Sequence, residues 1–385
     1  MKRHAGWSGL VRKARRWPWL AGMVAAAGAC QVGAQPWNLA MAQLPQPDGG
    51  QTTVFYPTLA TESAHRQGPF DLAWAANAVP AAGQRRLVVI SHGSGGSPWV
   101  HADLARSLVA AGHVVAVPQH QGDNIDDPSS PGPDSWARRP REVSQAIDRV
   151  AGDPRLAPVL QLDAVGVFGG SAGGHTALSM AGGAWSASRF RDHCLQHMAD
   201  DFSSCVGFIT RLDGSWLDAP KLWLARRVIA WRFNDEQLQR HTDHRVRAVV
   251  AMVPFAADFD PASLAAPAVP LGLVTAALDV NQVPRFHAQA VLQACAPRCQ
   301  VLMHLANGSH GAMLSPLPPL APGSLGAQLL GDPPGFDRQA TLPRLHRCLS
   351  SFFTHHLSLP ATTTTADGPR PATAPPGSTA CAIPP

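Results

Sequence analysis

The stretch Ala164-Val-Gly-Val-Phe168, followed by Gly169-Gly170-Ser171-Ala172-Gly173, decides the fold of this 385-residue chain. The first five residues are apolar or small, which is typical of a buried parallel strand, and a glycine-rich turn follows them directly. Residues 172–182 then have a helical pattern. A serine between two such glycines is exposed on a tight turn, because glycine has no Cβ that would clash there. The stretch therefore predicts a nucleophilic serine at position 171.

A serine hydroxyl is a weak nucleophile, so it needs a general base beside it. In a strand-turn-helix setting of this kind, the acid and then the histidine follow the serine in the chain. His310 lies in Asn307-Gly-Ser-His-Gly311, a loop of small residues after the last predicted strand, 301–304. We predict His310 as the base rather than His304, which lies on that strand.

Asp279 is the predicted acid that orients the histidine. It follows the predicted strand 271–275 and precedes a helix that begins near Pro284. Asp258 and Asp260, which follow the strand 248–253, are the alternatives. Both can equally be explained by helix capping or by a turn at Pro261.

An oxyanion hole needs two backbone N–H groups. One is expected from Ala172, the residue after the nucleophile, and the other from Ser94. Ser94 lies in His92-Gly93-Ser94-Gly95-Gly96, directly after the predicted strand 87–91. We interpret His92 as a structural hydrogen-bonding residue. Residues 120–124 could shape the pocket or bind an ion, but we favour a role in holding the loop structure.

Strands alternate with helices through most of the chain, which predicts an α/β fold with a mostly parallel sheet and helices on both faces. Residues 35–50 are interpreted as a polar lead-in, and the predicted domain covers 50–357. The remaining predicted strands are 52–56, 70–76 and 114–117, and the remaining predicted helices are 101–111, 139–151, 284–294 and 339–353.

Residues 183–246 interrupt this alternation, between the nucleophile helix and the next strand. They contain four tryptophans, Trp185, Trp216, Trp223 and Trp231, and two cysteines. We interpret the segment as a helical lid over the site. The alternative is a packed surface insertion whose tryptophans belong to the core.

The N-terminus resembles an export signal. Residues 1–34 hold six basic residues and no acidic one, an apolar run covers 17–29, and small residues at Val32-Gly33-Ala34 offer a cleavage point. Alternatives are cleavage at Ala40-Met41-Ala42, a twin-arginine signal, and a lipoprotein signal with a membrane anchor at Cys30. The rest of the chain has 25 basic and 26 acidic residues, so we expect no nucleic-acid partner. The predicted location is the periplasm or the extracellular space.

Six cysteines follow Cys30, and an even number in an exported chain suggests disulfides. Sequence proximity favours the pairs Cys194–Cys205, Cys295–Cys299 and Cys348–Cys381, whereas some of these residues could instead be buried free thiols. We predict no metal and no cofactor, since His241, Asp243 and His244 lack further ligands. Residues 358–385 are rich in Pro, Thr and Ala, which predicts a disordered tail.

The blocks 87–124 and 136–174 are similar to a group of bacterial dienelactone-hydrolase-like proteins, which looks related to platelet-activating-factor acetylhydrolases and to cutinase-like polyester hydrolases. The resemblance covers about residues 50–355. It implies the α/β-hydrolase fold, with a triad of Ser171, Asp279 and His310 and with Ser94 and Ala172 at the oxyanion hole. Dienelactone hydrolases themselves use a cysteine nucleophile, so the resemblance does not imply a lactone substrate.

The sequence thus predicts an exported serine hydrolase that cleaves a small-molecule or lipid ester through an acyl-enzyme. A lipase or a polyester depolymerase is one alternative. Another is a non-catalytic binding protein on the same fold.

Overall fold

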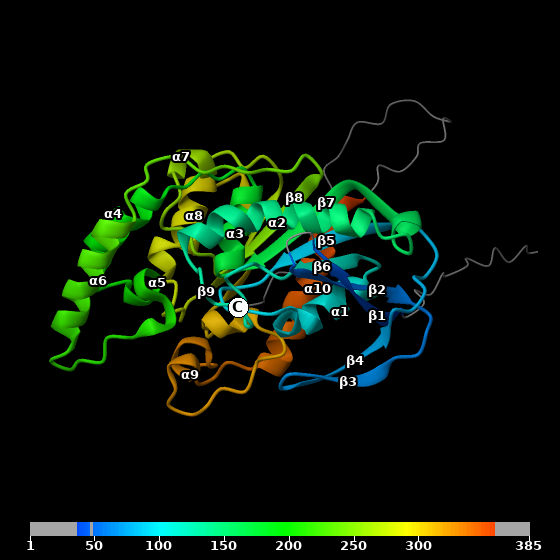
Figure 1. Cartoon of the computed structure of the whole chain (residues 1–385), viewed down its shortest axis with the longest axis horizontal. Coiled ribbons are helices and arrows are strands. Elements are labelled where there is room, and N and C mark those ends of the chain that lie inside the picture. The colour runs from blue at the N-terminus through cyan, green and yellow to red at the C-terminus, as the bar shows by residue number, and fades with distance from the viewer. Residues whose placement is uncertain (1–36, 47–48, 359–385) are drawn as a thin grey trace, which may run out of the picture. The chain divides into compact units, whose positions relative to one another are not determined.

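A computed structural model of the chain describes residues 37–46 and 49–358 (Figure 1). The predicted signal segment, and all of the predicted tail except Ser358, lie outside these residues. None of the helices within the described ranges is both long and apolar enough to cross a membrane.

The core of the structure is a ten-stranded sheet in the order β10-β9-β8-β7-β5-β6-β2-β1-β4-β3. The six strands from β10 to β6 run parallel, whereas β2 is antiparallel to both β6 and β1. The predicted α/β class with a mostly parallel sheet is therefore confirmed. The strands are β1 (Asn38–Pro45), β2 (Gln51–Thr58), β3 (Ser63–Gln67), β4 (Phe70–Ala76), β5 (Arg85–Ser91), β6 (Val114–Pro118), β7 (Leu160–Gly170), β8 (Val246–Met252), β9 (Leu271–Ala276) and β10 (Cys299–Leu305).

The sheet begins earlier than the sequence suggested. Residues 35–50 were expected to be a polar lead-in, but β1 pairs with β2 along its whole length, and Leu39, Ala40, Met41 and Ala42 are buried. The strand is buried on both faces and none of its residues is β-branched, so it has neither the alternation nor the residue types of a typical strand. Cleavage at Ala40-Met41-Ala42 would cut this strand in two.

Helices cover both faces of the sheet. Side chains of α2 and α3 pack in one core with Leu87 and Val89 of β5, and side chains of α1 and α10 pack in a second core with Val88 and Ile90. Successive residues of a strand point to opposite faces, so the two cores lie on opposite sides of the sheet. The helices are α1 (Ala102–Ala110), α2 (Pro133–Ala151), α3 (Ala172–Met180), α4 (Ala187–His197), α5 (Phe202–Val206), α6 (Asp218–Arg232), α7 (Pro261–Leu264), α8 (Ala288–Cys295), α9 (Leu325–Leu330) and α10 (Arg338–Leu357).

Helix α2 is longer than predicted. It begins at Pro133, a favoured first helical position, whereas the prediction placed its start at residue 139 with Pro140 in the first turn. Pro140 instead lies inside the helix, where it removes one backbone donor. The six added residues, 133–138, bring Ser135 and Trp136 onto the buried side of α2, which also carries Arg139.

The insertion at 183–246 folds into α4, α5 and α6 with irregular connections. The sulfur atoms of Cys194 and Cys205 lie 2.07 Å apart, and those of Cys295 and Cys299 lie 1.93 Å apart, so two predicted pairs are at bonding distance. Cys381 of the third predicted pair lies outside the described residues. Such pairs are typical of an oxidising compartment.

Candidate active site

Ser171 lies at the turn between β7 and α3, with φ 57° and ψ −122°. A positive φ is unfavourable for a residue with a Cβ, and the surroundings must hold it. The Ser171 N–H donates to the Met252 carbonyl at 3.1 Å, and the Phe255 N–H donates to the Ser171 carbonyl at 3.2 Å. Both partners belong to the end of β8 and the residues after it.

The flanking glycines are sterically required. A Cβ on Gly169 would lie 1.9 Å from the Gly173 carbonyl oxygen, and a Cβ on Gly173 would lie 1.9 Å from the Ser91 carbonyl oxygen. The predicted reason for the glycines, close approach of backbone at the turn, is thereby confirmed.

His310 and Asp279 lie at the same edge of the sheet as Ser171, because the parallel strands β7, β9 and β10 all end there. The His310 Nδ1 and Asp279 Oδ2 atoms are 2.7 Å apart. Both side chains are only 1 % exposed. The other ring nitrogen of His310, Nε2, is buried and has no hydrogen-bond partner in the described part of the protein.

Two backbone donors that the sequence did not suggest hold the Asp279 carboxylate. The N–H groups of Asn281 and Gln282 each donate to Asp279 Oδ1 at 2.8 Å, which leaves Oδ2 for His310. An aspartate that accepts from residues two and three positions later forms a local turn, and the run Asp279-Val-Asn-Gln is compatible with such a turn. The carboxylate is thus oriented before any substrate binds.

The alternative residues have other partners. Asp258 accepts a hydrogen bond from His175 Nε2 at 3.0 Å in a fully buried pair. Asp260 caps α7 by accepting from the Ala262 N–H, as the capping interpretation predicted. His304 Nδ1 lies 2.7 Å from Thr275 Oγ1 on the neighbouring strand β9. Of these candidates, the structure brings only Asp279 together with His310.

The loop after β5, which contains Ser94, is held by a buried ion pair. Arg139 of α2 is fully buried and donates to the Asp123 carboxylate through Nη2 at 2.8 Å and to the His92 carbonyl through Nη1 at 2.5 Å. Asp123 in turn accepts from the Ser94 hydroxyl and from the Gly95 N–H. The predicted structural role of the 120–124 loop is confirmed, whereas the role of Arg139 was missed.

Burial raises the pKa of the Asp123 carboxyl, because it disfavours the charged form. The charge of Arg139 and the hydrogen bonds from Ser94, Ser135 and Arg139 lower this pKa by more, so the carboxyl has a pKa below its ordinary value. The pair therefore stays ionised inside the protein and fixes the loop next to the serine.

Two buried histidines, His92 and His120, belong to the network around this loop. His120 lies between the Ser91 hydroxyl, at 2.8 Å from Nε2, and Glu142, at 2.5 Å from Nδ1. His92 Nδ1 lies 2.8 Å from the Gly93 carbonyl oxygen. Burial lowers the pKa of both imidazoles well below the ordinary value, and the Arg139 charge adds to this effect. His92 is a structural residue, as predicted.

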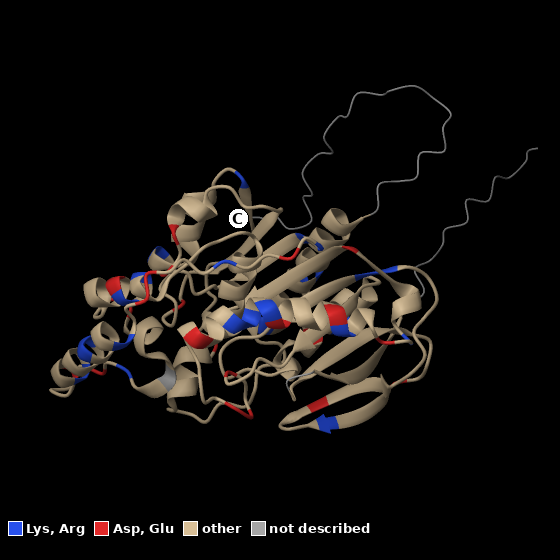
Figure 2. Ribbon diagram, turned by 45° about the horizontal axis from the view of Figure 1, so that its top comes forward, with Lys and Arg blue, Asp and Glu red and all other residues tan. Residues whose placement is uncertain are grey.

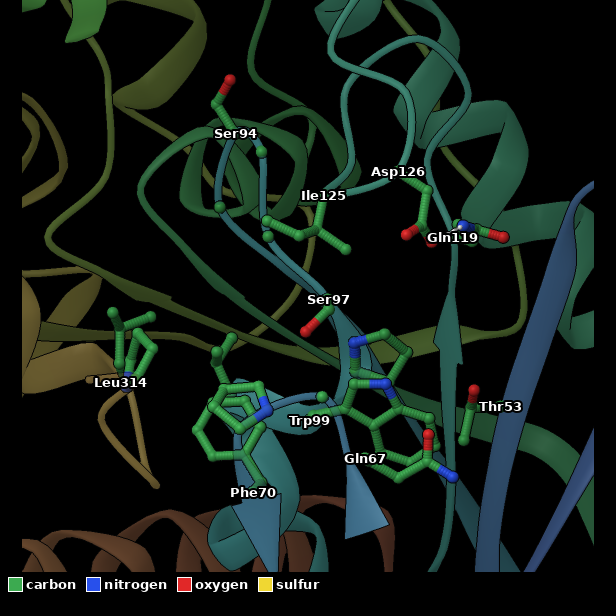
Figure 3. Close-up of a pocket in the computed structure, with 18 of the residues that line it drawn as sticks. Thr53, Gln67, Phe70, Ser94, Ser97, Trp99, Gln119, Ile125, Asp126 and Leu314 are labelled. Atoms are coloured by element: carbon green, nitrogen blue, oxygen red, sulfur yellow. Dashed lines mark hydrogen bonds between the residues drawn. The ribbon is translucent and has the colours of Figure 1, made fainter. Parts of the chain in front are cut away.

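Ser171 and His310 both line a cavity of about 680 Å³. One part of its wall is polar, with Thr53, Gln67, Gln119 and Asp126 gathered on one side in Figure 3, while Phe70 and Leu314 lie away from them. The Ser94 hydroxyl points away from the other labelled side chains, toward Asp123. A substrate with one apolar and one polar part would match these walls.

No residue of 183–246 is among the described residues that line this cavity. The walls come instead from the turn between β3 and β4, from the loops after β5 and β6, and from residues 310–330. The lining therefore does not support a lid. The alternative, that the tryptophans of the insertion belong to the core, is correct for Trp185, which is 3 % exposed. It is wrong for Trp216, Trp223 and Trp231, which are 60–82 % exposed.

Among the residues that the structure describes, His193, Asp201 and His287 form one group of potential metal ligands, none of which lines the cavity at Ser171. The Ala256 N–H donates to His287 Nδ1 at 3.0 Å, so a neutral His287 carries its proton on Nε2, which lies 2.9 Å from Asp201 Oδ2. That nitrogen has no lone pair for a metal. The group is better described as a carboxylate that joins the insertion to the segment after Asp279.

Comparison with known proteins does not assign the chain to a family. The chain matches no protein-family model, and no curated protein is significantly similar to it. The resemblance to the dienelactone-hydrolase-like group therefore stays a prediction.

Gly173→Ala tests the steric requirement at the turn. We expect this variant to lose at least about 2 kcal/mol of unfolding free energy in urea, because the methyl group meets backbone that cannot move away. Gly326→Ala in α9 is the control, since the atoms nearest to the added Cβ, on Leu320 and Ser324, would be 3.8 Å away. Equal stability of Gly173→Ala and the wild type would contradict the geometry described.

Asp201→Asn tests the junction of the insertion. Burial raises the pKa of the Asp201 carboxyl, but the hydrogen bonds from His193 and His287 lower it by more, so the folded pKa lies below the unfolded one. The ionised group thus stabilises the fold near neutral pH, and this contribution is lost as the pH falls below about 4. We expect Asp201→Asn to cost about 2–4 kcal/mol near neutral pH, with a smaller difference in acid.

The measurement for this variant is urea unfolding across that pH range. Asp192→Asn provides the control, since the Asp192 side chain is 64 % exposed and pairs with the adjacent Arg191. A cost for Asp201→Asn no larger than for the control would show that the junction does not stabilise the fold.

Proposed function

We propose that the protein is a serine hydrolase with the α/β-hydrolase fold that cleaves carboxylic esters through an acyl-enzyme. The observation that carries the proposal is the state of His310. One ring nitrogen is bound to Asp279 at 2.7 Å, and the other is unpartnered and belongs to a ring that lines the same cavity as Ser171. An imidazole held in this way can accept a proton from a serine hydroxyl.

In the proposed reaction, Asp279 accepts a hydrogen bond from Nδ1–H of His310, which keeps the proton on Nδ1 and leaves the lone pair on Nε2. Nε2 takes the Ser171 proton as Ser171 Oγ attacks the ester carbonyl carbon. The tetrahedral intermediate collapses, the alcohol leaves with the proton from His310, and the acyl group remains on Ser171. Water then attacks the acyl-enzyme by the same route and releases the acid.

The carbonyl oxygen becomes negative in each tetrahedral intermediate and needs donors. We assign these to the N–H groups of Ala172 and Ser94. Ala172 is the first residue of α3, where the backbone N–H has no partner within the helix. The buried pair of Arg139 and Asp123 would keep the Ser94 segment in position, since Asp123 binds the Ser94 hydroxyl on the far side from the substrate.

The walls of the cavity favour an ester with an apolar part and a hydrogen-bonding part. A lipase or a polyester depolymerase is the second candidate, supported by the apolar residues Phe70, Trp99 and Leu314. A non-catalytic binding protein is less well supported, because Asp279 is paired with His310 and both Ser171 and His310 line the same cavity. The two cysteine pairs support an exported protein of the periplasm or the extracellular space.

Ser171→Ala and His310→Ala should each reduce hydrolysis of p-nitrophenyl butyrate by at least about a thousandfold, since each removes a reacting group. The matched controls are His304→Gln and Asp260→Asn, which change the alternative residues and should retain most of the activity. Circular dichroism verifies the fold of each variant. Undiminished turnover by Ser171→Ala would refute the proposal.

Ala172→Pro tests the oxyanion donor. Proline is well tolerated at the first position of a helix, but it lacks the N–H. We expect kcat to fall by about a hundredfold to a thousandfold, with a smaller change in KM. Ala172→Ser keeps the N–H and should retain most of the activity. Similar kcat values for the two variants would argue against a donor at this position.

A further inference from the structure

Helix α6 of the insertion is apolar on two opposite sides. Its inner side packs on the core through Leu222, Ala225 and Ile229, and Ile229 is 4 % exposed. With about 3.6 residues per turn, Trp223, Leu224, Val228 and Trp231 fall on the other side. Their exposed fractions are between 46 % and 80 %.

Two further exposed apolar residues precede α6 in the chain. Trp216 is 82 % exposed and Ile209 is 85 % exposed. A helix with apolar residues all round is normally buried, and clustered exposed tryptophans are unusual on a protein that contacts only water. We refer to Ile209, Trp216, Trp223, Leu224, Val228 and Trp231 as the tryptophan patch.

The helix that carries most of the tryptophan patch also carries three arginines. Arg226, Arg227 and Arg232 lie on α6, and the Arg227 guanidinium is 5.7 Å from the centre of the Trp223 ring. The acidic residues of this segment are Asp213 and Asp218, and Lys221 lies within 3.5 Å of both. Arg232 has a distant partner in Asp134 at 3.8 Å. The segment 207–232 thus has five basic and two acidic residues.

Figure 2 shows basic residues of α6 as blue bands at the outer edge of the insertion. Within the described ranges, no carboxylate lies within 4.0 Å of the guanidinium groups of Arg226 and Arg227. These charges are therefore available to an outside anion.

We infer that the tryptophan patch and its arginines dock the protein on an anionic lipid surface. Tryptophan rings favour the level of lipid headgroups, and arginines bind headgroup phosphates. A helix with exposed apolar and basic residues of this kind lies in the plane of a bilayer surface without crossing it.

The positive charge of the patch favours an anionic lipid surface over a second copy of the chain as its partner. In a two-fold interface the same surface meets itself, so Arg226 and Arg227 would face the arginines of the other copy. The only acidic residues of the segment are already bound by Lys221. Anionic lipid complements the charge, whereas a second copy repeats it.

The inference does not depend on the proposed chemistry, because the tryptophan patch contributes no described residue to the cavity wall. It adds a location to the proposed function, since an enzyme held at a lipid surface would meet esters that are concentrated there. Binding is measured with the full chain and with Ser171→Ala, so that failure of docking and failure of catalysis are separate results.

The experiment is co-flotation with vesicles of equal parts phosphatidylglycerol and phosphatidylcholine, and with vesicles of phosphatidylcholine alone. We expect the protein to bind the anionic vesicles, and to bind the neutral vesicles at least about tenfold more weakly. Binding to the anionic vesicles should fall in high salt. Trp223→Ser combined with Trp231→Ser, and Arg226→Gln combined with Arg227→Gln, should each weaken binding by at least about tenfold. Val79→Ser, which changes an apolar residue of 82 % exposure outside the patch, should have no effect.

Sedimentation velocity of the protein without vesicles tests whether the patch instead binds a second copy of the chain. A monomer is expected for the wild type and for the variants. Failure of the wild type to bind anionic vesicles would overturn the inference, as would equal binding of wild type and patch variants. A dimer that the tryptophan variants dissociate would assign the surface to a second copy instead.

Discussion

A strained backbone at Ser171 determines much of what surrounds it. The residue has a positive φ, which costs free energy, and hydrogen bonds to Met252 and Phe255 hold it in place. The turn also needs the Ser91 carbonyl to lie against Gly173, which brings the end of β5 to the start of α3. Strands β5, β7 and β8, which are neighbours in the sheet, therefore have to end together at this point. A serine at this turn lies above the sheet edge where β9 and β10 deliver Asp279 and His310.

The buried ion pair of Arg139 and Asp123, next to this turn, is stabilised by hydrogen bonds to the guanidinium. Burial of a guanidinium is expensive unless its donors are satisfied, and Arg139 uses its donors on Asp123 and on the carbonyls of His92 and Gly93. The result is a loop whose backbone is held from below by one side chain. The lowered pKa values of His92 and His120 fit this arrangement, since burial and the nearby charge of Arg139 both disfavour a protonated imidazole.

Local pattern was sufficient for the parallel strands, for the turn at Ser171 and for the pairing of His310 with Asp279. These features depend on short apolar runs, on glycines and on chain order. Local pattern was insufficient for β1, which has no β-branched residue and no alternation, and for β3, which is a mostly polar edge strand. The role of Arg139 could not be predicted, because its partners are 16 and 47 residues away in the chain. The cavity walls also depend on tertiary packing, which brings the β3–β4 turn to the site and leaves the insertion out of the wall.

Covalent labelling is the most direct measurement of the central claim, that Ser171 is a nucleophile activated by His310. The full chain is treated with a fluorophosphonate and analysed by intact mass and by peptide mapping. The proposal predicts one phosphonyl group per chain, on the peptide that contains Ser171, and no labelling of His310→Ala on the same time scale. An unlabelled wild type, or a label on a different serine, would contradict the assignment.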